Sequence, residues 1–252
     1  MKTVKKKSAI LSGTALLAVL IAFMFPAIYI VCLSLTAENG GAMFSLEQYR
    51  LLFGNAQLKR RLLNSCTLSI KTLVLQLPLS IMGGVMLTRC MPWLKRALLV
   101  LLLLMLLLPF QTYMFPVFIL FKRYGLYDTH KGLILFAAFS PLGPLTVYSF
   151  MRAIPNEQWE AASLDTSSFF RTVFHVILPQ LKPMLATLTL LCFTEIWNMV
   201  DPAIILLQKD ALSPASLSLN DNKAVSWAAA TAYLAPILLL YVPTVYRKAW
   251  QP

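Results

Sequence analysis

The sequence predicts an all-α integral membrane protein with six transmembrane helices and one long cytoplasmic loop between the fourth and the fifth. Hydrophobic residues make up 58% of the 252 residues and charged residues only 13%, whereas a soluble domain carries about 25% charged residues. Apolar runs long enough to cross a bilayer recur along the whole chain. The formal charge of +12 comes from basic residues between these runs, which is typical of membrane flanks and not of a nucleic-acid interface.

Six apolar segments reach the length of about 20 residues that a transmembrane helix needs. They are residues 10–35, 64–88, 97–121, 132–151, 183–207 and 224–246. The first is longer than the apolar core of a signal peptide, and no clear cleavage site follows it, so we expect it to be retained. The fourth contains SPLGPL, whose prolines and glycine predict a kink that packs against other helices. No separate soluble domain is expected within residues 1–252.

The basic residues predict which loops face the cytoplasm. The N-terminus, residues 89–96, residues 152–182 and the C-terminus hold slightly more Lys and Arg than the loops on the opposite side. Orientation usually follows the first span, and Lys2, Lys5, Lys6 and Lys7 precede it. We therefore expect both termini to lie in the cytoplasm, with residues 152–182 as the longest cytoplasmic loop.

This loop begins with a predicted surface helix. Asn156 suits the N-cap position, and Glu157 and Glu160 fall in the first turn, where the helix dipole favours negative charge. The side chains of Ala161 and Ala162 are short, so another backbone could approach this surface of the helix closely. From spacing alone, a solvated connector with an ordinary capped helix fits these residues equally well.

The second half of the loop predicts an amphipathic helix that returns to the membrane. Asp165-Thr166-Ser167 interrupts the first helix, and apolar residues then recur at helical spacing from residue 169 to residue 177. We expect Pro179 to end this second helix and Pro183 to stand in the first turn of the next span.

Five polar residues lie within or near the spans: Lys71, Gln76, Glu195, Asn198 and Asp201. Because a charge at membrane depth is costly, such side chains normally face a bundle interior or an aqueous path. We consider Lys71, Glu195 and Asn198 candidates for a substrate pathway. The alternatives are interhelical hydrogen bonds and, for Lys71, an ion pair with Glu195 or a side chain that extends to the membrane surface.

An aromatic residue joins these polar candidates. Trp197 precedes Asn198, and an indole ring can stack on a flat face of a substrate while an amide bonds its polar groups. Packing between helices is the alternative for Trp197.

No catalytic or metal-binding pattern is present in the sequence. Cys32, Cys66, Cys90 and Cys192 show no zinc spacing and are expected to be small buried apolar side chains. The two histidines have neither a second ligand at metal spacing nor a paired nucleophile, so we expect structural roles. An intramembrane enzyme would need such a constellation, and the chain has no GxxxxGK[ST] loop for ATP.

The loop and several spans resemble the ABC-importer permeases of the maltose type. Glu160-Ala161-Ala162, Asp165 and Ile177-Leu178-Pro179 are similar to the EAA motif of these permeases. The resemblance extends over most of residues 25–246 and is carried by residues 109–135, by FTEIWNMVDP (193–202), by SLEQYRLLFGN (45–55) and by LLNSCTLSI (62–70). Thr166 departs from the pattern, because the family has a glycine there that tolerates positive φ.

The resemblance implies a single permease domain over residues 1–252, with residues 152–182 as its coupling loop in the cytoplasmic membrane of a bacterium. It implies that the EAA helix docks on a separate ATP-binding subunit, with Glu160, Ala161, Ala162, Asp165, Thr166 and Pro179 at the coupling positions. The implied partners are two ATPase subunits, a second permease subunit that is a different chain, an extracytoplasmic solute-binding protein and the lipid bilayer, without nucleic acid. ATP and Mg would bind to the ATPase, and this chain would hold no cofactor.

The resemblance implies ATP-driven import of a sugar, an oligosaccharide or a related polyol. A permease for amino acids or peptides is the nearer alternative, and an intramembrane enzyme is the more distant one.

Overall fold

The computed structural model describes residues 21–22, 24–36, 44–155, 157, 169–220 and 229–236. These residues form helices and turns, and no β-strand occurs among them. They belong to two compact units, one of residues 1–59 and 218–236 and the other of residues 60–217 and 237–252. The predicted all-α class is confirmed for the described part of the chain.

The first unit joins three helical segments: Met24–Ser34, α2 (Glu47–Gly54) and residues 229–236. The Tyr49 hydroxyl hydrogen-bonds those of Ser34 and Thr231, each at 2.8 Å. Gln48 is buried and donates to the Leu33 and Thr36 carbonyls at the end of the first helix. Leu52, Leu58 and Ala229 form the small apolar core of this unit.

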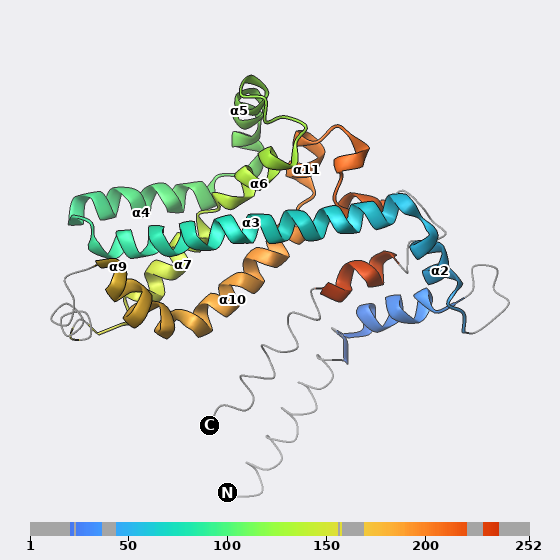
Figure 1. The fold of residues 1–252 in the computed structure, drawn as a ribbon, viewed down its shortest axis with the longest axis horizontal. Coiled ribbons are helices and arrows are strands. Elements are labelled where there is room, and N and C mark those ends of the chain that lie inside the picture. The colour runs from blue at the N-terminus through green and yellow to red at the C-terminus, as the bar shows by residue number, and fades with distance from the viewer. Residues whose placement is uncertain are drawn as a thin grey trace, which may run out of the picture. The chain divides into compact units, whose positions relative to one another are not determined.

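The second unit holds most of the helices that Figure 1 shows. α3 (Ala56–Arg89) begins in the first unit and runs through the second. The helices that follow are α4 (Pro92–Leu107), α5 (Phe110–Arg123), α6 (His130–Ala138), α7 (Leu142–Met151), α9 (Phe169–Thr172), the π-helix Val173–Ile177, α10 (Leu178–Trp197), α11 (Asp201–Leu206) and the 3-10 helices Asp210–Leu212 and Ala215–Asn220.

Two helical segments, Ala56–Arg89 and His130–Met151, are long and apolar enough to cross a membrane. A third results if Pro92–Leu107 and Phe110–Arg123 count as one span, although the two helices meet at a bend of 101°. The prediction of one continuous helix over residues 97–121 is therefore wrong. Pro109 explains the break, because a residue before proline is disfavoured in the α region, and Leu108 is extended (ψ 128°).

Two other predicted spans have different boundaries in the structure. The second helix begins at Ala56, eight residues before the expected start at 64. The fifth span, expected over 183–207, is also interrupted: α10 ends at Trp197, and α11 starts at Asp201 with Pro202 in its first turn.

The segment before α10 corrects the expected role of Pro179. The predicted return helix is present over residues 169–177, but it continues into α10, and Pro179 stands in the first turn of α10 instead of ending a helix. Since proline has no N–H, the His175 carbonyl cannot receive the usual bond from residue 179. The chain widens there into a π-turn in which the Leu178 N–H donates to the Val173 carbonyl. Pro183 lies inside α10.

One apolar cluster holds both ends of the loop of residues 152–168. Val147 and Met151 of α7 are buried together with Val173, Ile177 and Leu181 on the other side of the loop, and the cluster continues along α10 through Leu188 to Cys192. Within a membrane, van der Waals contacts between such side chains favour this packing. The loop is thus anchored at both ends to one core.

Candidate functional site

Three helix breaks meet at one cavity of about 710 Å³ in the second unit. Leu108 lies between α4 and α5, Ser140 between α6 and α7, and Met199 between α10 and α11, and all three line the cavity. Irregular backbone at membrane depth is tolerated where it is buried in protein or faces water. The three breaks therefore bring irregular backbone from separate parts of the chain to the wall of one cavity.

Two prolines remove main-chain hydrogen-bond donors at the break between α6 and α7. Pro141 and Pro144 have no N–H, so they cannot bond the carbonyls four residues earlier, at Ala137 and Ser140. Both of these residues line the cavity.

One wall of the cavity is aromatic. Phe110, Tyr113 and Phe136 line it, with ring centroids 5.7–6.3 Å apart in stacked and edge-to-face arrangements. Such mutual contacts hold the rings in fixed orientations. A flat apolar ring face beside polar groups suits a solute that has both an apolar face and hydroxyls.

Polar groups that accept hydrogen bonds gather on the opposing segments. Glu195 and Asn198 come from the end of α10, and Asp201 from the start of α11. Among the described residues that line this cavity there is no Lys, Arg or His. These residues therefore offer a solute carboxylates and an amide, and no cationic side chain.

Two of the four predicted pathway residues line the cavity. Glu195 and Asn198 do so, because positions three residues apart share one face of a helix. Trp197 lies on another face: its side chain is 1% exposed and stacks on Phe193, with ring centroids 5.4 Å apart. Lys71 is exposed, does not line the cavity and forms no ion pair with Glu195.

The sequence reasoning missed the aromatic wall and did not select Asp201 for the pathway. The available signal was PFQTY at residues 109–113, in which a proline breaks the helix and two aromatic residues follow at a spacing of three. Phe136 gave no such signal, because it lies in an apolar run. Gln76, which we expected to face the bundle interior, does so at 1% exposure, and its side chain finds no hydrogen-bond partner in the described part of the chain.

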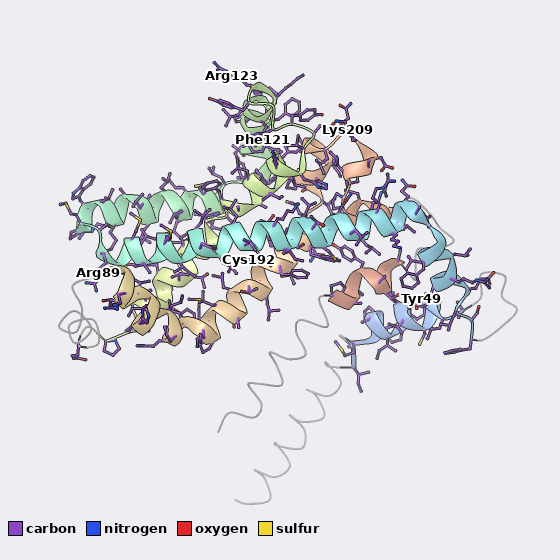
Figure 2. All side chains as sticks on the ribbon, viewed as in Figure 1. Tyr49, Arg89, Phe121, Arg123, Cys192 and Lys209 are labelled. Atoms are coloured by element: carbon purple, nitrogen blue, oxygen red, sulfur yellow. The ribbon has the colours of Figure 1, made fainter. Side chains whose placement is uncertain are left out.

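Asp128 fixes the segment that follows α11. It has a positive φ of 55°, and its carboxylate accepts the backbone N–H groups of Gln208 and Lys209, both at 2.9 Å. The Lys209 ammonium lies 3.1 Å from the same carboxylate, and Figure 2 labels Lys209 on this segment. These hydrogen bonds, foremost the one from the Lys209 N–H, hold the pKa of Asp128 below its ordinary value.

The start of α3 holds the same segment from a second direction. Arg61 pairs with Asp210, and Asn64 donates to the carbonyls of Ala211 and Ser213 at 2.9 and 3.1 Å. His130 has the structural role that we expected, since its Nε2 lies 2.8 Å from the Leu212 carbonyl oxygen. Loops that the charge pattern assigned to one side of the membrane therefore meet in space.

The coupling positions lie largely outside the described residues. Glu160, Ala161, Ala162, Asp165 and Thr166 all fall in the range 158–168 that the structure does not describe. Of the predicted coupling residues the structure describes Pro179, which is exposed at the start of α10.

The four cysteines are free thiols, and only Cys192 is fully buried. Among the residues that the structure describes, no group of three or more His, Cys, Asp or Glu side chains could hold a metal ion.

Comparison with known proteins gives consistent matches. Residues 76–250 match the family described as "binding-protein-dependent transport system inner membrane component". The diacetylchitobiose uptake system permease protein NgcG of Streptomyces coelicolor is 28% identical over 82% of this chain and 74% of its own length. The trehalose transport system permease protein SugB of Mycobacterium tuberculosis is 30% identical over 69% of this chain and 67% of its own length.

A solved structure supports the same fold. One chain of a bacterial ABC transporter involved in the import of the acidic polysaccharide alginate superposes with a TM-score of 0.82. The superposition covers 98% of this chain and 97% of that chain, at 19% sequence identity.

Proposed function

This chain belongs to the family of binding-protein-dependent transport system inner membrane components, and we propose that it lines the pathway of a bacterial ABC importer for a sugar or oligosaccharide. The predicted resemblance to maltose-type permeases is confirmed by the family match and by relatives that carry carbohydrate-permease names. Family members are transport components, so the intramembrane-enzyme alternative is set aside. The carbohydrate names of the relatives also favour sugars over amino acids or peptides as the solute.

The cavity at the three helix breaks carries the proposal. An aromatic ring face beside carboxylates and an amide matches the surface of a sugar, whose axial C–H groups are apolar and whose hydroxyls donate hydrogen bonds. Glu195 would accept hydrogen bonds from the sugar hydroxyls, and the Asn198 amide would both accept and donate them. Tyr113 and Phe136 would stack on the sugar ring. Trp197, which packs on another face of α10, would support the part of α10 that carries Glu195 and Asn198.

α10 connects the cavity to the cytoplasmic loop. Its 20 residues span about 30 Å at 1.5 Å per residue. One end carries Glu195 and packs at the cavity, and the other end shares its apolar core with α7 on the far side of the loop. A force applied to the loop would therefore move α7 and α10 together, and α10 would transmit it to the solute site.

We assign this force to a separate ATP-binding subunit that docks on the loop. Glu160 would pair with basic or amide groups of that subunit, Ala161 and Ala162 would allow close approach, and Asp165-Thr166 would form the bend. Pro179 would fix the start of α10 just after the loop. The subunit would bind ATP and Mg, and closure of two such subunits would drive alternating access.

The remaining partners follow from the family. The family name implies a solute-binding protein that delivers the solute, and a second permease subunit would complete the pathway. We expect six spans in all, with both termini in the cytoplasm of the bacterium.

Uptake measurements in cells test the proposed solute site. Glu195→Gln should lower the uptake rate of labelled oligosaccharide about tenfold or more, since a hydrogen bond to a charged group contributes about 1.5–3 kcal/mol. Asn198→Ala should lower it about two- to tenfold, since a hydrogen bond between neutral groups contributes about 0.5–1.5 kcal/mol. Lys71→Gln is the matched control, because it also changes a charged residue of a span but lies outside the cavity. Equal uptake by Glu195→Gln, Asn198→Ala and the control would rule out this cavity as the sugar pathway.

A further inference from the structure

A stripe of buried polar side chains runs along one face of α3. Each of its members is at most 2% exposed, and their spacing of three or four residues places them on one side of the helix. The stripe consists of Ser65, Ser69, Thr72, Gln76 and Ser80. The 34 residues of α3 extend over about 51 Å, more than the hydrocarbon thickness of about 30 Å. Because Thr72 stands near the middle of α3, the stripe lies at membrane depth.

The middle of the stripe makes no hydrogen bond within the described part of the chain. At its two ends, Ser65 Oγ accepts the Ala215 N–H and Ser80 Oγ donates to the Gln76 carbonyl, each at 2.7 Å. The hydroxyls of Ser69 and Thr72 and the side-chain amide of Gln76 have no such partner. A polar group that is buried in this way has lost its hydration without compensation. The side chains therefore favour a second conformation in which they meet water or a solute.

Two separate apolar cores adjoin the stripe, one on each side. The α7–α10 core contains Val147, Met151, Leu181, Leu188 and Cys192. The α5–α6–α11 core contains Met114, Phe121, Leu133, Ala203 and Leu206.

The stripe follows the boundary between these cores. Leu73 and Leu77 of α3 pack against the α7–α10 core, and Leu68 belongs to the α5–α6–α11 core. Along the chain, the break between α6 and α7 and the break between α10 and α11 separate one core from the other, and both breaks line the large cavity. Residues at the ends of helices commonly serve as hinges. The two breaks are thus placed where one core can move against the other.

One short segment lies between the stripe and the cavity. Pro141 lines the cavity. Gly143, two residues later, packs so closely on α3 that an added Cβ atom would overlap the hydroxyl of Ser80. Movement of this segment away from α3 would therefore join the stripe to the cavity.

We propose that Ser69, Thr72 and Gln76 line the solute path in a second conformation of the transport cycle, in which the two cores separate along α3. This inference rests on the function proposed above. The two hydroxyls and the amide then exchange hydrogen bonds with the hydroxyls of the sugar. Neutral groups suit a path through which a solute must move on, because their hydrogen bonds are weaker than those of charged groups.

Thiol labelling of the full chain, purified with its co-purifying subunits and placed in lipid nanodiscs, tests the opening. In a background without native cysteines, Ser69→Cys and Thr72→Cys are treated with a water-soluble methanethiosulfonate reagent, first without nucleotide and then after trapping with ATP and vanadate. Leu68→Cys is the matched control, because Leu68 is as deeply buried as Ser69 but belongs to an apolar core. We expect the two stripe variants to be labelled in one nucleotide state and to lose this labelling in the other. Leu68→Cys should stay unlabelled in both.

The variant Thr72→Val distinguishes a path residue from a structural one. It replaces the hydroxyl with a methyl group of similar size, so the Tm should stay the same or rise. Uptake is measured with the neutral di- or trisaccharide that wild-type cells take up fastest, and it should fall about two- to tenfold, the effect of losing one hydrogen bond between neutral groups. Thr189→Val is the matched control, because the Thr189 hydroxyl already donates to the Leu185 carbonyl of its own helix at 2.7 Å. Its uptake should equal that of the wild type.

Three outcomes would overturn the proposal. If Ser69→Cys and Thr72→Cys stay unlabelled in both states while Glu195→Gln lowers uptake, the cavity remains the solute site and the stripe is not part of the path. A lower Tm of Thr72→Val would assign its hydroxyl to a fixed hydrogen bond inside the protein. State-dependent labelling with wild-type uptake by Thr72→Val would assign the stripe to water alone. Conversely, if labelling depends on the nucleotide state and Glu195→Gln leaves uptake unchanged, the opening along α3 is supported and the proposed sugar cavity fails.

Discussion

Replacing Gly84 with alanine tests a close approach between α3 and α7. A Cβ atom at Gly84 of α3 would lie 2.5 Å from the Cβ and Cγ1 atoms of Val147 in α7 and 2.9 Å from the backbone nitrogen of Tyr148. A change of rotamer cannot relieve these contacts, because the Cβ atom of Val147 and the nitrogen of Tyr148 are both fixed by the backbone of α7. The helices must therefore separate, and this perturbs the core that α7 shares with α10.

The structure allows the size of the effect to be worked out. Overpacking a well-packed site costs about 1–3 kcal/mol, and contact with backbone places Gly84→Ala in the upper part of that range. The better helix propensity of alanine relative to glycine offsets about 1 kcal/mol of this cost. The net loss of about 1–2 kcal/mol corresponds to a fall in Tm of about 2–8 °C for a chain of this size.

Thermal unfolding of the purified protein in detergent, followed by size-exclusion chromatography, measures this change. Gly54→Ala is the matched control, because nothing lies within 4 Å of its Cβ position at the end of α2, and its Tm should not fall.

A second pair of residues provides a rescue test. Gly143→Ala would overlap the Ser80 side chain, and the added change Ser80→Gly should recover the lost stability. If Gly84→Ala melts at the same temperature as Gly54→Ala, α3 and α7 do not pack as described.

Three further predictions concern the loops. The pKa of Asp128 is lowered in the folded state, so its stabilisation of the 207–210 segment is present above the ordinary Asp value and is lost as the pH falls below about 4; protease sensitivity of that segment should rise there, and a flat profile would contradict the assignment. Glu160→Lys should release the ATPase subunit from the purified complex and abolish uptake, whereas Glu157→Lys should have a milder effect. If both variants retain the same amount of ATPase subunit, the loop is only a solvated connector. In a background without native cysteines, thiol reagents should label Ala153→Cys and Ala211→Cys, both exposed sites, from opposite sides of the membrane, and labelling of both from one side would refute the topology.

The sequence by itself determined the class of protein and the family. The excess of apolar over charged residues requires a lipid environment or a very large core, and a 252-residue chain cannot supply the latter. The EAA-like loop and the FTEIWNMVDP segment predicted the family, which the comparisons confirmed. Of the prolines at helix breaks, the sequence predicted a kink only at those of SPLGPL, and the breaks at Pro109 and Pro202 were not predicted. Prolines do not mark breaks by themselves, because Pro78, Pro116 and Pro183 stand inside helices. The bend of 101° between α4 and α5 was likewise not predicted.

Only the tertiary structure decided which residues meet. Leu108, Ser140 and Met199 lie far apart in sequence, yet their helix breaks line one cavity, and no local pattern encodes that convergence. The 100° turn per residue of a helix places Glu195 and Asn198 on one face and Trp197 on another, but sequence could not say which face is packed. The packed face is the one that carries Trp197, because the indole gains most by stacking on Phe193 in the core. The face with Glu195 lines the cavity, because a carboxylate is costly anywhere except where water or a solute can reach it.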